Sequence, residues 1–268
     1  MSYEDLPQIL RTVAQVIDSR EEGRGAHGLE HRRLTTIRRL LAGERLDAGL
    51  LNYNLESVHV GVAVTGPAPT AALEDLRARL NSRLLLVRVG DDVAWAWLGG
   101  NYQSVQADLK LLLTMKWPHD TAVACGATAE GLGGWRLTHR QALAALPIAQ
   151  HGPTPVVHHP AVALLATALH DDLLSSSLRQ AYLDPLEQDR DGGLTAKHTL
   201  RAYFKACRNA SSAAAELRVD RSTVSNRLKA IEDRLGHPPE AVSAELEVAL
   251  RLDEITNQDG SLQDLTTC

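Results

Sequence analysis

The hydrophobic pattern of the chain changes near Pro160, and this change limits the folds that the chain can adopt. Before Pro160, runs dense in valine, such as Val58–Val64, alternate with helical stretches, as in a layered α+β domain. After Pro160 the apolar residues recur at the three- and four-residue spacing of amphipathic helices. We therefore predict an α+β domain followed by an all-α domain. The helices expected after Pro160 are Ala161–His170, Ser175–Tyr182, Thr195–Cys207, Ser211–Leu217, Arg221–Leu235 and Ser243–Ile255.

The first 155 residues are predicted to form N-terminal helices and then a mixed sheet. An apolar stripe from Leu6 to Ile17 indicates one helix, and Leu29–Leu41 indicates a second that ends at Gly43. The sheet that follows is expected to carry helices on one face. Its elements are predicted in the order strand Val58–Val64, helix Thr70–Asn81, a hairpin of Leu84–Val89 and Val93–Leu98, helix Val105–Met115, strand Thr121–Gly126, helix Trp135–Gln150 and a last short strand at Val156-Val157.

We place the domain boundary between residues 151 and 160, because two prolines and a glycine cluster in the sequence His151-Gly-Pro-Thr-Pro. The predicted organisation is an N-terminal helical segment at 1–45, an α+β domain at 46–155, a helical domain at 160–258 and a polar tail at 259–268.

The composition is typical of a globular, cytoplasmic protein. Hydrophobic residues make up 44% of the chain and charged residues 23%. Apolar runs such as Ala161–Ala166 are much shorter than the roughly 20 residues that cross a bilayer, and the N-terminus lacks the features of a signal peptide. The net charge is −5, so any contact with DNA must come from a local basic patch. We expect no membrane partner.

The cysteines and histidines do not suggest a disulfide framework or a metal site. The three cysteines are far apart and odd in number, which indicates a reducing compartment, and we expect Cys125 and Cys207 to be inert core thiols. His158 and His159 are adjacent, so on an extended chain they point to opposite sides and cannot easily chelate one ion. We predict no metal, no cofactor and no catalytic residue.

Two further features have simple structural interpretations. Trp95 and Trp97 share one face of a predicted strand, so they lie either in the core or on a surface for a ligand or a dimer partner. Ser175–Ser177 precedes a predicted helix and is interpreted as its cap rather than as a nucleophile.

Residues 211–228 have the features of a helix-turn-helix. Two helices that cross at a sharp angle need small residues at their contact, and Ala213–Ala215 provide them. Asp220 is expected to cap the second helix by accepting from the backbone N–H of Ser222 or Thr223. Arg218 stands at the turn position usually held by glycine, where a positive φ costs about 1 kcal/mol or more. The core between the two helices is expected to be closed by Leu217, Val219, Val224 and Leu228.

The second helix, Arg221 to about Arg234, is predicted to be the recognition helix, which enters the major groove by its N-terminal residues. Arg221, Ser222, Ser225 and Asn226 would contact base edges or phosphates. Thr223 would donate to a phosphate at the helix start, and Arg227 and Lys229 would hold the DNA backbone. Residues 197–234 contain nine basic and four acidic residues, a net +5, which agrees with this interpretation.

The C-terminal region resembles the helix-turn-helix domain of the PucR/CdaR family of bacterial regulators over about residues 174–255. The family often has His-Arg-Asn-Thr-Val where this chain has Asp220-Arg-Ser-Thr-Val, so the operator sequence cannot be carried over. The resemblance rests on Leu186-Glu-Gln-Asp-Arg-Asp, Thr199-Leu-Arg-Ala-Tyr-Phe204, Asn209, Ala214-Ala-Glu-Leu, Arg221-Ser-Thr-Val-Ser-Asn-Arg-Leu-Lys-Ala-Ile-Glu, Leu235-Gly236 and Leu246-Glu-Val-Ala-Leu-Arg-Leu.

The middle domain resembles the degenerate GGDEF-like domain that precedes this helix-turn-helix in the family. The resemblance rests on Gly43-Glu44, on Leu55 through Val64 and on the run from Gly131 to Leu146. A working diguanylate cyclase would carry Gly-Gly-Asp/Glu-Glu-Phe on the central hairpin, whereas this hairpin reads Val89-Gly-Asp-Asp-Val93. An acidic pair such as Asp91-Asp92 in a tight turn is far more often turn chemistry than a Mg²⁺ site.

These observations predict a sequence-specific transcriptional regulator that binds double-stranded DNA as a homodimer and is not an enzyme. The GGDEF-like domain would serve dimerisation or the sensing of a small-molecule effector. Family members commonly carry a further sensory domain upstream, so Leu29–Leu41 would be a connector or a dimer contact.

Two alternatives remain. One is a nucleotide-binding or cyclase-like enzyme with a helical protein-interaction module, whose activity Asp91→Ala with Asp92→Ala would abolish. The other is a helix-turn-helix used only for protein contact, which predicts weak DNA binding that does not depend on salt.

Overall fold

The computed structural model describes residues 28–188 and 191–263, with the side chains of 257–263 left aside. The helix predicted at Leu6–Ile17 lies outside the described residues. The chain divides into two compact units, here called the N-terminal unit (Met1–Leu143) and the C-terminal unit (Ala144–Cys268). Each is described by itself, and the domain limits given above stay a prediction. No helix among the described residues combines the length and the apolar character that crossing a membrane requires.

The N-terminal unit begins, among the described residues, with a helix over 28–41, which confirms the helix predicted there. Most of the other predicted elements are also found, and β5 is an additional short strand. The elements are η1 (Gly49–Leu51), β1 (Val58–Thr65), α2 (Pro69–Arg77), β2 (Arg83–Arg88), β3 (Val93–Gly100), α3 (Tyr102–Thr114), β4 (Ala122–Cys125), β5 (Ala129–Glu130) and α4 (Gly131–His151), which continues into the C-terminal unit.

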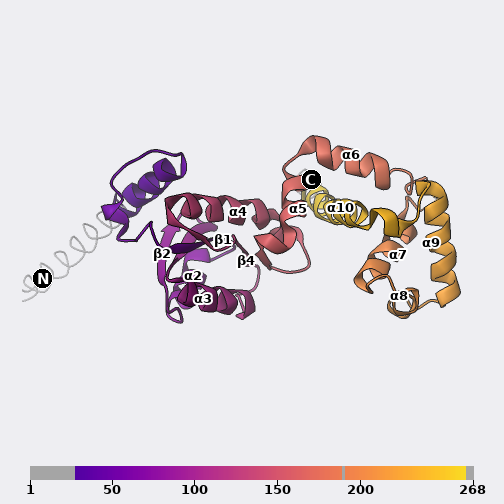
Figure 1. Ribbon diagram of the computed structural model, residues 1–268, viewed down its shortest axis with the longest axis horizontal. Helices are drawn as coiled ribbons and strands as arrows, with labels where there is room; N and C mark the ends of the chain where they lie inside the picture. Colours follow the sequence, from indigo (N-terminus) through magenta and orange to yellow (C-terminus); the bar gives the residue numbers. More distant parts are fainter. Residues whose placement is uncertain (1–27, 189–190, 264–268) are drawn as a thin grey trace, which may run out of the picture. The chain divides into compact units, whose positions relative to one another are not determined.

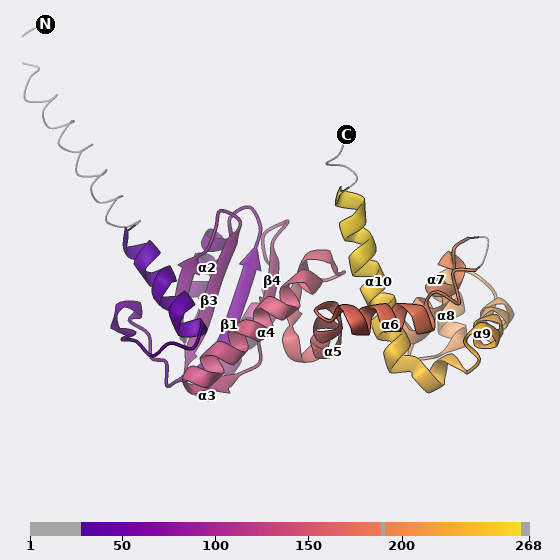
Figure 2. The ribbon, with the colours of Figure 1, turned by 90° about the horizontal axis from the view of Figure 1, so that it is seen from above.

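The strands of this unit lie in the order β2-β3-β1-β4, and β5 also pairs with β1. The predicted hairpin is confirmed: β2 and β3 are antiparallel, with Leu85 opposite Trp97. Helices on one face alone were expected, and this is wrong. Figures 1 and 2 show α4 on one face of the sheet and α2 and α3 on the other. The physical reason is visible in β1, which is buried from His59 to Val64, so that both of its faces need a cover.

Trp97 lies in the core against α4, and the partly buried Trp95 packs against the same core. The ring of Trp97 is fully buried and stacks on the ring of Trp135 at a centroid distance of 4.6 Å. Trp97 Nε1 donates to the carbonyl oxygen of Trp135 at 3.2 Å. Trp95 meets the ring of His139 edge-on at 4.5 Å. Gly61 makes this packing possible, because a Cβ there would lie 2.6 Å from the backbone nitrogen of His139.

His139 makes the stability of the N-terminal unit depend on pH. Its ring is buried, neither ring nitrogen has a hydrogen-bond partner among the described residues, and burial lowers its pKa from 6.5 to about 4. The unfolded chain therefore takes up a proton first as the pH falls. The contribution of neutral His139 to the free energy of unfolding is complete above pH 6.5 and is lost as the pH falls towards 4. Between pH 7.5 and pH 5 we expect the free energy of unfolding to fall by about 2 kcal/mol for this reason.

Urea unfolding followed by tryptophan fluorescence measures this loss, because Trp95, Trp97, Trp117 and Trp135 all lie in the N-terminal unit. His139→Leu should abolish the part of the pH dependence that His139 causes. An equal loss of stability in the variant and the wild type would contradict this assignment.

The C-terminal unit is helical apart from one short strand, and each helix predicted after Pro160 is found. Its elements are β6 (Val156–His158), α5 (His159–Leu169), α6 (Asp172–Tyr182), α7 (Leu194–Lys205), α8 (Ala210–Leu217), α9 (Arg221–Leu235), η2 (Pro239–Val242) and α10 (Ser243–Gln263). Figure 2 shows α10 crossing α6, and α10 contacts both α5 and α6. It continues to Gln263, into the segment for which a tail was expected.

Two local predictions for this unit are wrong. Ser175–Ser177 lies inside α6, and the cap is Asp171, whose side chain accepts from the backbone N–H of Leu174 at 2.9 Å. Cys207 is exposed rather than buried in a core, and it lies two residues after the end of α7, where φ is 51°. Cys125 does lie in the core, and burial raises the pKa of its thiol to about 12.

Candidate nucleic-acid interface

The first helix of the motif, α8, is fixed at both ends by local chemistry. The side-chain oxygen of Asn209 accepts from the backbone N–H groups of Ser211 and Ser212, at 2.9 and 3.1 Å. At the other end Arg218 adopts a left-handed conformation, with φ 55°, and its N–H donates to the carbonyl oxygen of Ala215. The expected strain at Arg218 is therefore present. An asparagine directly before a helix of small residues is a capping signal that the sequence offers.

The second helix, α9, begins at Arg221 as predicted, but the predicted cap at Asp220 is wrong. Asp220 occupies the N-cap position, and its side chain makes no capping hydrogen bond. Its backbone carbonyl oxygen instead accepts from the N–H groups of Thr223 and Val224, at 3.0 and 3.3 Å. The exposed carboxylate is left in solvent, so the start of α9 depends on backbone hydrogen bonds alone.

A small core holds α8 and α9 at their crossing and fixes α9 against α7. Ala213 and Val224 are fully buried, which confirms that small residues meet at this contact. Ala215 is exposed, so it takes no part in it. Val219, Leu217 and Leu228 pack against this core, as predicted. Figure 1 shows α8 and α9 following α7 at one end of the C-terminal unit. The contacts of α9 with α7 and α8 leave one side of α9 uncovered within this unit.

The uncovered side of α9 carries most of the residues predicted to contact DNA. Arg221, Ser222, Ser225, Asn226 and Lys229 are all exposed. Their spacing, i, i+1, i+4, i+5 and i+8, places them on one face of the helix. The structure therefore brings these five residues together in one polar, basic stripe.

Thr223 and Arg227 lie away from this stripe. Both are half-buried. Nη1 of Arg227 donates to Oγ1 of Thr199 on α7, at 3.4 Å. The position of Arg227 on α9 therefore turns its side chain towards α7, where it supports the orientation of the helix.

The positive charge of the motif is more local than the sequence count indicates. Lys197 and Arg201 are ion-paired with Asp253 of α10, and Lys205 is ion-paired with Glu216 of α8. In contrast, no carboxylate of residues 28–188 or 191–256 pairs with Arg221 or Lys229. Arg221 and Lys229 therefore place unpaired positive charge on the exposed stripe of α9, and the exposed Arg208 and Arg218 lie outside it.

Comparisons with known proteins bear on both units. The PucR C-terminal helix-turn-helix domain matches residues 197–252, and the GGDEF-like domain matches residues 44–148, so that the two cover more than half of the chain in the family's order. The chain belongs to the PucR family of transcriptional regulators. A solved structure, the regulator of polyketide synthase expression from Bifidobacterium adolescentis, is 16% identical to this chain. The match covers 84% of this chain and 91% of the chain of that regulator. Its TM-score is 0.40, so it carries no argument about the fold. Among curated proteins no match is found.

The PucR motif residues outside α9 have structural roles. The carboxylate of Asp191 accepts from the N–H groups of Gly193 and Thr195, both at 3.0 Å, and so begins α7. The carboxylate of Glu187 accepts from Nζ of Lys197 at 2.8 Å. The hydroxyl of Tyr203 donates to Glu240 at 2.6 Å, and burial together with this contact raises the pKa of Tyr203 to about 12.

The hairpin of the GGDEF-like domain is built as a turn. Asp91 forms an ion pair with Arg88, and Nε of Arg88 donates to the carbonyl oxygen of Gly90 at 3.1 Å. The side chain of Asp91 is otherwise in solvent. Within the described part of the chain, no group of three His, Cys, Asp or Glu residues is placed to hold a metal ion.

The two helix starts of the motif give contrasting expectations for stability. Asn209→Ala should destabilise the C-terminal unit by about 1 kcal/mol, because two capping hydrogen bonds are lost. Asp220→Ala should change the stability by less than about 0.5 kcal/mol, since its carboxylate caps nothing. Urea unfolding followed by circular dichroism at 222 nm compares the two. Equal losses for both variants would contradict the hydrogen bonding described here.

Proposed function

We propose that this regulator binds double-stranded DNA in a sequence-specific way as a homodimer, with α9 as its recognition helix. The observation that supports this most is the exposed stripe of Arg221, Ser222, Ser225, Asn226 and Lys229 on a helix whose other side packs against α7 and α8. A recognition helix needs one polar face free for the major groove and an apolar face that fixes it to the domain.

Each residue of the stripe has a contact that suits its chemistry. Arg221, at the first position of α9, would donate to O6 and N7 of a guanine. Ser222, Ser225 and Asn226 are short polar groups for base edges or phosphates. Lys229, two turns along the helix, would contact a phosphate, and Thr223 would donate to a phosphate at the helix start. Arg227 would act mainly by positioning α9 through Thr199.

A dimer is part of the proposal because one helix-turn-helix makes a small interface with DNA. Two copies read half-sites about 34 Å apart, which is one turn of the double helix. The GGDEF-like domain would contribute to dimerisation or bind a small-molecule effector. A regulator of this kind works on the chromosome, so we place it in the cytoplasm.

A hydroxyl-radical footprint on the DNA upstream of the protein's own gene tests this proposal. We expect two protected half-sites of related, inverted sequence, separated by one helical turn or a multiple of it. Ser225→Ala with Asn226→Ala should weaken the protection, because both side chains lie on the stripe. The matched control is Glu245→Ala, which removes an exposed side chain on α10. Protection without any half-site symmetry, or none at all, would contradict the proposal.

A further inference from the structure

The C-terminal unit has an apolar groove with an apolar side chain standing beside it. The groove lies between α5 and the first half of α10 and encloses about 370 Å³. Its lining includes Ala161 and Leu164 of α5 and Ala244 and Val248 of α10. Leu164 is 72% exposed, so this large apolar side chain has little cover from its own unit. Leu164 is part of the groove lining, so its exposed side chain and the groove form one continuous apolar surface, and contiguous apolar patches mark interaction sites.

Two opposite charges border this groove. Glu247 and Arg251 lie one turn apart on α10, both line the groove and both are exposed. Neither has an ion-pair partner in the part of the chain whose side chains are described. The next carboxylate, Glu254, is already ion-paired with Nε of Arg201 at 2.6 Å.

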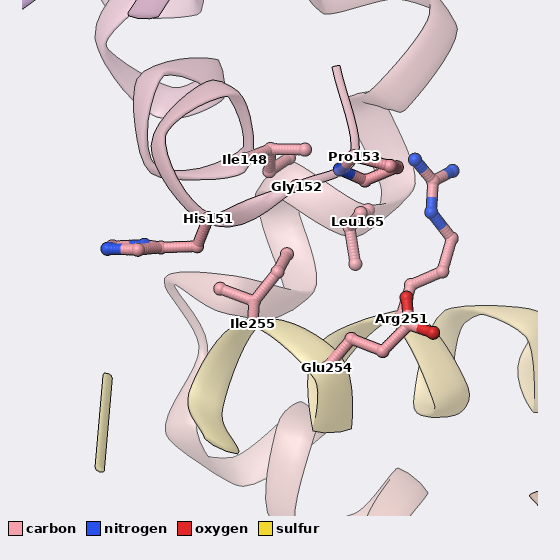
Figure 3. A pocket seen from close by; sticks show the side chains of 8 residues that line it. All are labelled: Ile148, His151, Gly152, Pro153, Leu165, Arg251, Glu254 and Ile255. Atoms are coloured by element: carbon pink, nitrogen blue, oxygen red, sulfur yellow. The ribbon is translucent and has the colours of Figure 1, made fainter. Parts of the chain in front are cut away.

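Arg251 also borders a neighbouring cavity of about 260 Å³, which Leu165 and Ile255 line from α5 and α10. Figure 3 shows the guanidinium of Arg251 extended away from the carboxylate of Glu254. The guanidinium of Arg251 is therefore free to meet a carboxylate from outside this unit.

We propose that the groove between α5 and α10 is the surface on which a second copy of this chain docks. A two-fold interface uses the same patch on both copies, so the patch must be complementary to itself. This groove meets that requirement, because it presents a protruding Leu164, a hollow, one positive charge and one negative charge. In this arrangement the two α10 helices are antiparallel, and the two-fold axis passes between Glu247 and Arg251. Each Glu247 then faces the partner's Arg251, and each Leu164 enters the partner's groove between α5 and α10.

This inference rests on the dimer of the proposed function and assigns its surface to the helical unit. It leaves the GGDEF-like domain free for effector sensing.

Charge reversal in the full chain tests this docking surface, with the dimer dissociation constant measured by analytical ultracentrifugation. Glu247→Arg alone and Arg251→Glu alone should each raise that constant at least tenfold, because each places like charges opposite one another. The double reversal should restore it to within about threefold, and the two single variants, when mixed, should form a heterodimer.

A second pair of variants tests the apolar part of the surface. Leu164→Asp should raise the dissociation constant at least tenfold. Leu194→Asp is the matched control: Leu194 is an exposed leucine of the same unit, at the start of α7 and outside the groove, so the constant should not change. Circular dichroism confirms that each variant is folded.

The outcomes separate the two claims. A wild-type dimer that none of these substitutions weakens would overturn this surface and leave the dimer in place. A wild-type monomer at all concentrations up to about 100 μM would overturn both the surface and the proposed dimer. If Leu164→Asp lowers the Tm while the protein still sediments as a dimer, the groove is covered by another part of the same chain and the inference is wrong.

Discussion

Asp253→Asn is expected to destabilise the C-terminal unit by about 3–5 kcal/mol, the largest loss of stability expected here from one substitution. The carboxylate of Asp253 is 4% exposed and meets Nζ of Lys197, which is 6% exposed, at 3.1 Å. Arg179 and Arg201 approach the same carboxylate at 3.2 and 3.4 Å. Removing the charge of Asp253 leaves Lys197 buried with Glu187 as its remaining partner, and a buried cation without full compensation is costly.

The measurement is urea unfolding followed by circular dichroism at 222 nm, and the control is Glu245→Gln. Glu245 is an exposed carboxylate on the same helix, so its loss should change the stability by less than about 0.5 kcal/mol. Lys197→Met combined with Asp253→Leu should recover much of the loss, because an apolar pair needs no compensating charge. An effect of Asp253→Asn no larger than that of the control would contradict the role given to this ion pair.

Arg221→Ala is expected to lower the affinity for the operator about 10- to 100-fold, or about 1–3 kcal/mol, and to lower the affinity for a scrambled duplex much less. The reason is that Arg221 is exposed at the first position of α9, free of any carboxylate partner among the described residues, and is placed to read a base edge. The loss should therefore appear mainly as a loss of sequence preference.

Lys229→Ala is the matched comparison, because it removes one positive charge from the same face of α9 two turns later. It should weaken binding to both duplexes equally and reduce the slope of log affinity against log salt by about 1. Equal behaviour of the two variants would mean that Arg221 contacts only phosphate. Fluorescence anisotropy with both duplexes measures these effects.

Much of the fold follows from patterns that are local in the sequence. The turn Gly90-Asp91-Asp92 predicts the β2–β3 hairpin, and the start and the end of α9 coincide with the predicted helix. The contact at Ala213 and Val224 is also predictable, because small residues are required where helices cross closely. Local chemistry decides these features, so a single sequence contains the signal for them.

Other features depend on contacts between distant residues, for which one sequence has no signal. The direction of Arg227 is set by Thr199 of α7, and the pairing of Lys197 with Asp253 joins residues far apart in the chain. For this reason the charge count over residues 197–234 includes Lys197 among the basic residues available to DNA, whereas Lys197 is buried. The cover on both faces of the sheet likewise depends on how α4 packs back onto the strands, as in the stacking of Trp135 on Trp97. The strand β5 consists of only two residues, too few to form a hydrophobic pattern in the sequence.

The central claim is that this chain recognises a DNA sequence through α9. The most direct test is fluorescence anisotropy of the full-length wild type with the duplex upstream of its own gene and with a scrambled duplex of equal length and composition, at several salt concentrations. We predict binding that weakens as salt is raised and a preference for the native duplex that persists at each concentration. Equal affinity for the two duplexes, or no binding to either at low salt by a folded dimer, would contradict the claim and favour a helix-turn-helix that serves protein contact alone.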